Sequence, residues 1–233
     1  MRALLAGWVL SLALLLAASP PAWADDRGDA QTLVDSSTLA VQEMFTTGDA
    51  AAIADMQGML RRARAVLVCP RIFRAGFILG GEGGGCALVA RDAAGSWSSP
   101  AFYGLASGSL GLQFGVQDMQ VLMLVMSDAG LTALMDSQFK LGADASVAVA
   151  GMGAGLEGST TAAGGADIVT FARARGLFAG LALEGSLLTN RSDWNRAYYG
   201  QEASPRQVVV AMQAHNPGAD PLRAALMRYG SPP

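Results

Sequence analysis

Apolar residues change their spacing along the 233-residue chain. In residues 30–45 and again in residues 50–64 they recur every three or four positions, which is typical of amphipathic helices. One face of the second segment carries Ile53, Met56, Leu60 and Ala63. Asp49 precedes that segment as a helix N-cap. The sequence therefore predicts two helices near the N-terminus.

Residues 65–91, AVLVCPRIFRAGFILGGEGGGCALVAR, contain short apolar runs interrupted by proline and glycine. The runs cover residues 65–69, 72–79 and 86–90, with a turn at Cys69–Pro70 and a glycine cluster between the last two. Runs of this length predict three strands joined by tight turns. Arg71 and Arg74 flank an apolar pair, so we expect cationic groups at the rim of an apolar hairpin.

The C-terminal half adds more strand and helix signals. Apolar and polar residues alternate from Leu110 to Gln117, and residues 121–126 form a continuous apolar run. Further expected elements are a short helix capped by Ser127, a strand in 139–151, a hairpin from 168 to 188 turning near Arg175, a helix from Ser192 to Gly200, and two helices behind Pro205 and Pro221. We expect an α+β fold, with a strongly curled, mostly antiparallel β-sheet of six or more strands packed by N- and C-terminal helices.

The first 24 residues have the features of a signal peptide. Arg2 precedes the apolar residues 3–18, and Ala22-Trp23-Ala24 is a small-residue cleavage site. We expect cleavage before Asp25 and export to the periplasm or the outer membrane, with residues 25–233 as a single domain. The alternative is an uncleaved N-terminal anchor.

Composition supports a packed domain and argues against nucleic-acid binding. Charged residues make up 15% of the chain, hydrophobic residues 52%, and there are 29 glycines, which suits a large core with compact turns. The formal charge is −3, and removal of the leader takes away Arg2. A net acidic chain without a basic run does not indicate a nucleic-acid partner.

Residues that carry catalysis or bind metals are sparse. His215 is the single histidine and cannot build a histidine-rich metal site, and the carboxylates are scattered, with Glu82 and Glu184 beside glycines. Gly153, Gly155 and Gly158 match a dinucleotide fingerprint, but residues 159–165 do not start a helix that would bind phosphate. We expect no catalytic residue, no metal site and no cofactor.

Cys69 and Cys86 are the two cysteines of the chain. Export to an oxidising compartment would allow a disulfide. In a simple three-strand meander the two residues would fall at opposite ends of the middle strand, beyond the reach of a disulfide. The alternative is a pair of buried, inert thiols.

Several blocks of the sequence, in the same order, resemble one known family. They are VLVCPRIFRAGFILGGEGGG, WSSPAFYGLASGSLGLQFGVQ, FKLGADASVAVAG, FARARGLFAGLALEGSLL and NRAYYG, which together cover roughly residues 30–200. The chain is similar to the SYLF domain, or Ysc84 actin-binding-domain family. The resemblance implies a lipid-binding, membrane-associated module rather than an enzyme, since eukaryotic relatives bind phosphoinositides and some bind actin.

Two functions are compatible with these observations. The first is a lipid-binding module of the bacterial cell envelope, in which arginines meet anionic phospholipid while Phe73, Phe77 and Ile78 insert. The candidate lipid-binding residues are Arg61, Arg62, Arg64, Arg71 and Arg74. The arginines that end the second helix are equally suited to complementing its dipole, and the phenylalanines to packing in the core.

The second function is a structural or protein-interaction domain for envelope integrity, with an envelope protein as partner. Actin is not expected as a partner, because an exported bacterial chain would not meet it.

Overall fold

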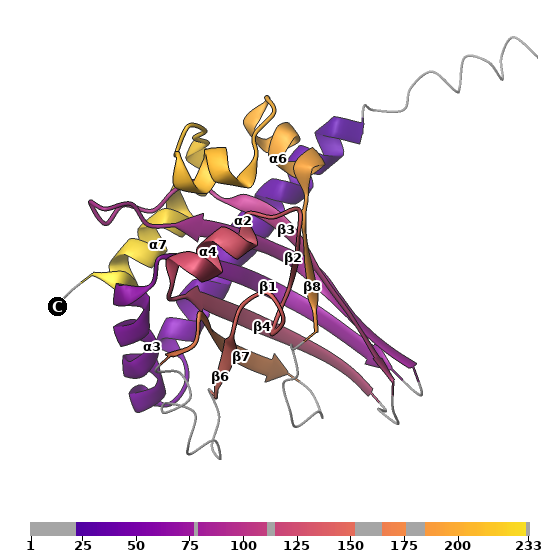
Figure 1. Ribbon diagram of the computed structural model, residues 1–233, viewed down its shortest axis with the longest axis vertical. Coiled ribbons are helices and arrows are strands. Elements are labelled where there is room, and N and C mark those ends of the chain that lie inside the picture. Colours follow the sequence, from indigo (N-terminus) through magenta and orange to yellow (C-terminus); the bar gives the residue numbers. More distant parts are fainter. Residues whose placement is uncertain (1–21, 77–78, 111–114, 152–164, 176–184, 232–233) are drawn as a thin grey trace, which may run out of the picture.

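The computed structural model describes residues 22–76, 79–110, 115–151, 165–175 and 185–231 (Figure 1). The helical elements are α2 (Ala22–Thr46), α3 (Ala50–Arg62), α4 (Asp128–Leu134), α6 (Ser192–Tyr199), the π-helical turn η2 (Arg206–Val210), the 3₁₀ turn η3 (Pro217–Ala219) and α7 (Asp220–Gly230). The strands are β1 (Ala65–Gly76), β2 (Leu79–Ala90), β3 (Ala101–Leu110), β4 (Gly115–Val125), β5 (Gln138–Lys140), β6 (Val147–Gly151), β7 (Ile168–Arg175) and β8 (Leu187–Asn190).

The described strands form one eight-stranded sheet in the order β5-β8-β3-β2-β1-β4-β7-β6. All neighbouring strands are antiparallel except β6 and β7, which are parallel. The two edge strands, β5 and β6, are consecutive in the chain and only residues 141–146 separate them. Because this connection is short, the sheet must curl until its two edges approach each other. The predicted α+β fold with a curled, mostly antiparallel sheet is confirmed.

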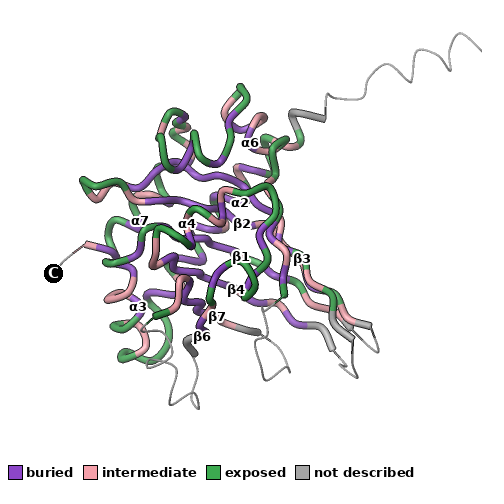
Figure 2. Tube along the Cα trace, viewed as in Figure 1, coloured by how far each residue is buried: buried purple, intermediate pink, exposed green. Residues whose placement is uncertain are grey.

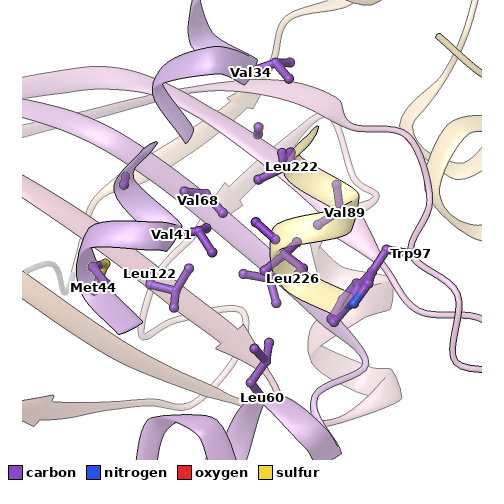
Figure 3. Close-up of a cluster of buried hydrophobic side chains, with 14 of the residues drawn as sticks. Val34, Val41, Met44, Leu60, Val68, Val89, Trp97, Leu122, Leu222 and Leu226 are labelled. Atoms are coloured by element: carbon purple, nitrogen blue, oxygen red, sulfur yellow. The ribbon is translucent and has the colours of Figure 1, made fainter. Parts of the chain in front are cut away.

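Helices from both chain ends cover the outer face of the curled sheet. Figure 3 shows this cluster, in which Val34, Val41 and Met44 of α2 and Leu222 and Leu226 of α7 lie over Val68, Val89 and Leu122 of the sheet. Leu60 of α3 and Trp97 complete it, and all these side chains are buried. The two predicted N-terminal helices are confirmed, and Asp49 Oδ1 accepts a hydrogen bond from the Ala52 amide as the predicted N-cap.

The inner face of the sheet has its own apolar cluster. It brings together Phe139 of β5, Leu188 of β8 and Ile168 of β7, which come from both margins of the sheet, with Leu67 and Met123 at its centre. The central strands are thus buried on both faces near the helices, which explains the continuous apolar run at 121–126. Within the described residues, no helix combines the length and the hydropathy needed to cross a membrane.

Two strands, not three, are formed by residues 65–91, and the predicted turn at Cys69–Pro70 is wrong. Strand β1 continues through Pro70 by means of a β-bulge between Cys69 and Ile72. A bulge leaves residues unpaired and so tolerates a proline that a regular ladder would exclude. Cys69 and Cys86 therefore lie opposite each other on β1 and β2 and form a disulfide, with Cα atoms 4.2 Å apart. The expectation that their separation exceeds disulfide reach is wrong for the same reason.

Further expectations in the C-terminal half differ from the structure of the described residues. Leu110 and residues 115–117 of the alternating stretch belong to different strands, β3 and β4, which β2 and β1 separate in the sheet, and residues 111–114 lie outside the described residues. In the described part of the predicted 168–188 hairpin, β7 pairs with β4 and β6, whereas β8 pairs with β3 and β5; residues 176–184 lie outside the described residues. Residues 139–151 contain two strands instead of one, and the first C-terminal helix is only the π-helical turn η2.

Candidate functional site

The five predicted lipid-binding arginines lie in three different places. Arg61 and Arg62 end α3, and Arg64 follows them before β1 begins. Arg71 lies at the β-bulge on the outer face of the sheet, beside α2. Arg74 lies on the inner face. Their role in lipid binding stays a prediction, but the structure does not bring all five onto one surface.

The exposed C-termini of α3 and α7 gather three arginines. Arg61, Arg62 and Arg228 are exposed, and among the described residues none of their side chains forms a salt bridge. We call these three residues the cationic end. Arg64 lies next to them, but its Nε is 3.3 Å from Asp128 Oδ1 in an exposed ion pair. Arg64 is therefore partly neutralised by its neighbour.

Arg91 explains why the two helix ends meet. Its Nη1 donates to the Arg61 carbonyl at 2.8 Å, and its Nη2 donates to the Gly230 carbonyl at 3.5 Å. The guanidinium also lies 4.4 Å from the centre of the Trp97 ring. Helix C-termini carry partial negative charge, so one cation holds both α3 and α7 in place, while burial lowers the pKa of Arg91. Sequence reasoning missed this residue because its two acceptors lie in helices distant in the chain.

Arg71 lies where two surface hollows meet along α2. The larger has a volume of about 420 Å³ and the smaller about 380 Å³, and both are lined by Ser36, Pro70 and Arg71. The bulge turns Arg71 onto this face, where its Nε donates to Asp118 Oδ2 of β4 at 2.8 Å. Gly84 permits the bulge, because a Cβ there would collide with the carbonyl oxygen of Arg71.

Arg74 points into the curled sheet and pairs with Glu82. Its Nε donates to Glu82 Oε2 at 2.7 Å, and Ser186 Oγ donates to Glu82 Oε1 at 3.3 Å. In the register of the sheet Ser107, Glu82, Arg74 and Gln117 form one row across β3, β2, β1 and β4. The expectation that Arg74 lies at an exposed rim is wrong, and Glu82 lies in a strand rather than in a turn.

Of the apolar residues proposed to insert into lipid, the structure describes Phe73 alone. Phe73 is exposed on the outer face beside Arg71, so it is not a core residue. Phe77 and Ile78 lie outside the described residues, as do Gly153, Gly155 and Gly158 of the dinucleotide-like motif. The ends of β1, β2 and β3 that extend away from the helices are mostly pink and green in Figure 2, in contrast to the buried parts of these strands beneath the helices.

His215 lies near a serine and a carboxylate that sequence spacing did not connect with it. Its Nδ1 is 3.2 Å from Ser99 Oγ, and its Nε2 is 3.9 Å from Asp220 Oδ1. The second distance exceeds a hydrogen bond, Asp220 Oδ1 is 2.7 Å from Arg223 Nη1, and Ser99 is buried. The arrangement therefore lacks the relay and the accessible hydroxyl of a serine hydrolase. The described residues also contain no group of three His, Cys, Asp or Glu placed to hold a metal ion.

Comparison with known proteins gives a consistent set of relatives. The family model described as "Ysc84: Las17-binding protein actin regulator" matches residues 106–229. "SH3 domain-containing YSC84-like protein 1" of Homo sapiens is 34% identical over 132 residues, which is 56% of this chain and 39% of that protein. "Protein YSC84" of Saccharomyces cerevisiae is 29% identical over 167 residues, which is 70% of this chain and 36% of that protein. The chain thus spans less than two fifths of the length of these curated relatives.

The names of these relatives correct one expectation. "LAS seventeen-binding protein 3" of Saccharomyces cerevisiae is 27% identical over 167 residues, and the family description itself names actin regulation. The exclusion of actin from the partners was therefore wrong, because the relatives point to actin-related partners. The family is not a known class of enzymes. Since the family model covers more than half of its length, the chain belongs to the Ysc84 family, whose domain is also called SYLF.

Proposed function

We propose that this protein is a non-catalytic module that binds anionic phospholipid membranes in the cell envelope through its cationic end. The observation that supports the proposal is that Arg91 holds together the ends of α3 and α7, which carry the exposed residues Arg61, Arg62 and Arg228. Each arginine near an anionic bilayer surface contributes about 1 kcal/mol of attraction. Three such residues at one end supply a local patch on a chain whose net charge is negative.

The neighbourhood of the cationic end suits a surface contact. Met227, beside Arg228 on α7, is an exposed large apolar residue. A methionine next to an arginine can enter the headgroup region while the guanidinium group binds a phosphate. The carbonyls at the ends of α3 and α7 would weaken this attraction, but Arg91 already binds one carbonyl from each helix.

Export is part of the proposal and has two independent supports. The leader sequence ends in Ala22-Trp23-Ala24, and cleavage there would leave Asp25 in the first turn of α2. The disulfide between Cys69 and Cys86 is typical of proteins that fold in an oxidising compartment. N-terminal sequencing of the mature protein tests cleavage, and a mature chain that begins at Met1 would contradict it.

Vesicle flotation tests membrane binding directly. The purified protein is mixed with vesicles of neutral phosphatidylcholine, or with vesicles that also contain phosphatidylglycerol, and centrifuged through a density step. We expect the protein to float only with the anionic vesicles, and added salt to abolish flotation because it screens the charges. Equal recovery with both vesicle types, or none with either, contradicts the proposal.

A second candidate is a protein-binding role in which the partner is actin or an actin regulator. The family description and the name of the yeast relative support it. Co-sedimentation with filamentous actin tests this candidate. Saturable binding to filaments in the absence of vesicles would favour it over the membrane proposal, and the absence of binding would remove it.

A further inference from the structure

The two hollows beside α2 join into one groove. One wall is a single stripe of α2 that carries Asp29, Thr32, Ser36, Leu39 and Glu43, spaced three or four residues apart. The facing side runs from Trp194 of α6, past the bulge residues Pro70 and Arg71, to Gln120 and Arg173. The stripe extends over fifteen residues from Asp29 to Glu43, so at about 1.5 Å per step the groove is roughly 21 Å long. We call it the α2 groove.

The two Nη groups of Arg71 are available to bind a ligand at the centre of the α2 groove. Asp118 accepts a hydrogen bond from its Nε, and among the described residues its two Nη groups have no partner. The Arg71 side chain is 70% exposed, so these groups are accessible. Asp118 orients the guanidinium, and the free Nη pair has the geometry that binds a carboxylate with two hydrogen bonds.

Two buried polar atoms of groove residues also lack partners. Gln120 donates through Nε2 to Glu43, but its Oε1 is buried without a donor among the described residues. Trp194 has a buried indole N–H without an acceptor. Buried polar atoms nearly always have hydrogen-bond partners, so Gln120 at one end of the groove has one unmatched acceptor and Trp194 at the other end has one unmatched donor. An extended backbone, with alternating N–H and C=O groups, offers both kinds of partner.

The α2 groove also has exposed apolar side chains at its mouth. Leu39 is 66% exposed on the α2 wall, and Phe73 is 45% exposed two residues beyond Arg71. Two large apolar residues near a guanidinium whose Nη groups have no partner among the described residues favour a ligand with both apolar groups and a carboxylate.

From this complementarity we infer that the α2 groove binds an extended peptide segment of a partner protein, with an aspartate or glutamate at its centre. The central carboxylate binds the Nη groups of Arg71, apolar neighbours contact Leu39 and Phe73, and the backbone lies along the groove between Gln120 and Trp194. At about 3.3 Å per residue, six or seven residues fill the groove. Asp29, at the end near Trp194, favours a positive charge at that end of the peptide.

A positional-scanning library of acetylated, amidated heptapeptides tests the inference by fluorescence polarisation. Each pool fixes Asp, Glu, Asn, Gln or Lys at one position, and the purified protein is titrated. Pools with Asp or Glu near the centre should bind about tenfold more tightly than the matched Asn or Gln pools. In Arg71→Gln the preference for an acid should vanish, and in Ser36→Trp, which fills the junction of the two hollows, all binding should be lost. Arg61→Gln/Arg62→Gln should bind like the parent.

The comparison of these variants distinguishes peptide binding in the α2 groove from binding to a membrane. Circular dichroism and thermal unfolding establish that each variant is folded before it is compared. The inference is overturned if no pool binds with a Kd below about 1 mM, or if the acid preference survives in Arg71→Gln. It is also overturned if Arg71→Gln abolishes flotation with anionic vesicles and no peptide binds, because the groove would then be a lipid site.

Discussion

Arg74 and Glu82 form an ion pair on the inner face of the sheet, with only 11% and 3% of their side chains exposed. They are direct cross-strand partners on β1 and β2, one row away from the bulge that presents Arg71 on the opposite face. Arg71 and Arg74, both on β1, thus lie on opposite faces of the sheet. One is buried and paired inside the sheet, whereas the other lies on the surface in the α2 groove.

Breaking this pair should destabilise the fold strongly. Arg74→Met or Glu82→Leu leaves one buried charge without its partner, and we expect a loss of about 3–5 kcal/mol in the free energy of unfolding. The double variant Arg74→Met/Glu82→Leu should recover most of that loss, because no uncompensated charge remains. Urea denaturation of the three variants measures this. A double variant as unstable as the sum of the single ones would show that the pair is not coupled.

Gly84 should be far less tolerant of a side chain than Gly108. A Cβ at Gly84 would meet the carbonyl of Arg71 and the side chain of Ile72, whereas a Cβ at Gly108 has nothing within 4 Å. We expect Gly84→Ala to cost about 1–3 kcal/mol of stability, and Gly108→Ala to change it by less than about 0.5 kcal/mol. Chemical denaturation of both variants gives the comparison. Equal effects would mean that the bulge does not require a glycine.

The disulfide should stabilise the folded chain by restricting its unfolded state. Cys69 and Cys86 close a loop with a sequence separation of 17, for which chain entropy predicts about 3 kcal/mol. Cys69→Ala/Cys86→Ala should therefore unfold at a lower urea concentration, and a reducing agent should lower the midpoint of the parent protein but not of the variant. If full reduction leaves the urea midpoint of the parent protein unchanged, the disulfide does not stabilise the folded chain.

Acid stability should depend on Asp167. Its carboxylate accepts hydrogen bonds from Ser127 Oγ at 2.5 Å and from the Ser146 hydroxyl at 2.7 Å, and these bonds lower the pKa of Asp167 below its ordinary value of 3.8. A lowered pKa in the folded state contributes stability that is present above the unfolded-state pKa and is lost as the pH falls through the folded-state pKa.

Asp167→Asn should therefore be less stable than the parent at pH 7, and the two should converge as the pH drops below about 4. Thermal unfolding across pH 7 to 2 measures the difference. The control is Asp55→Asn, an exposed residue of α3. If the gap between parent and Asp167→Asn is the same at pH 7 and pH 2, the hydrogen bonds to Asp167 do not favour its charged form.

The sequence was sufficient for the fold class and for most helices, the one at 206–210 excepted, because these depend on local spacing. Asp49 and Ser127 cap helices as their positions suggest, and the glycine-rich strands do form a curled sheet. The pairing register of the strands could not be predicted from local spacing in the same way. Pro70 resembles a strand break, and only the bulge opposite Gln120 shows that the strand continues. The pairing of Cys69 with Cys86 and the burial of Arg74 both follow from that bulge.

Long-range contacts account for the remaining differences. Strands β7 and β8 are consecutive in the chain but lie on opposite sides of β3, β2, β1 and β4, a separation that no local pattern encodes. In the same way, Arg61 and Arg62 were identifiable from their position at a helix end, whereas Arg228 became a candidate only when Arg91 was seen to join α3 and α7. Spacing thus identified some members of the cationic end but not the complete set.

The most direct test of membrane binding compares two double variants that lose the same charge. Arg61→Gln/Arg62→Gln removes two arginines from the cationic end, and Arg27→Gln/Arg206→Gln removes two exposed arginines elsewhere. Binding to anionic vesicles is measured by flotation over a range of lipid concentrations. We expect the first variant to bind about 30-fold more weakly, from about 1 kcal/mol for each arginine, and the control to bind nearly as the parent does. If both variants bind equally well, the cationic end is not the membrane-binding surface.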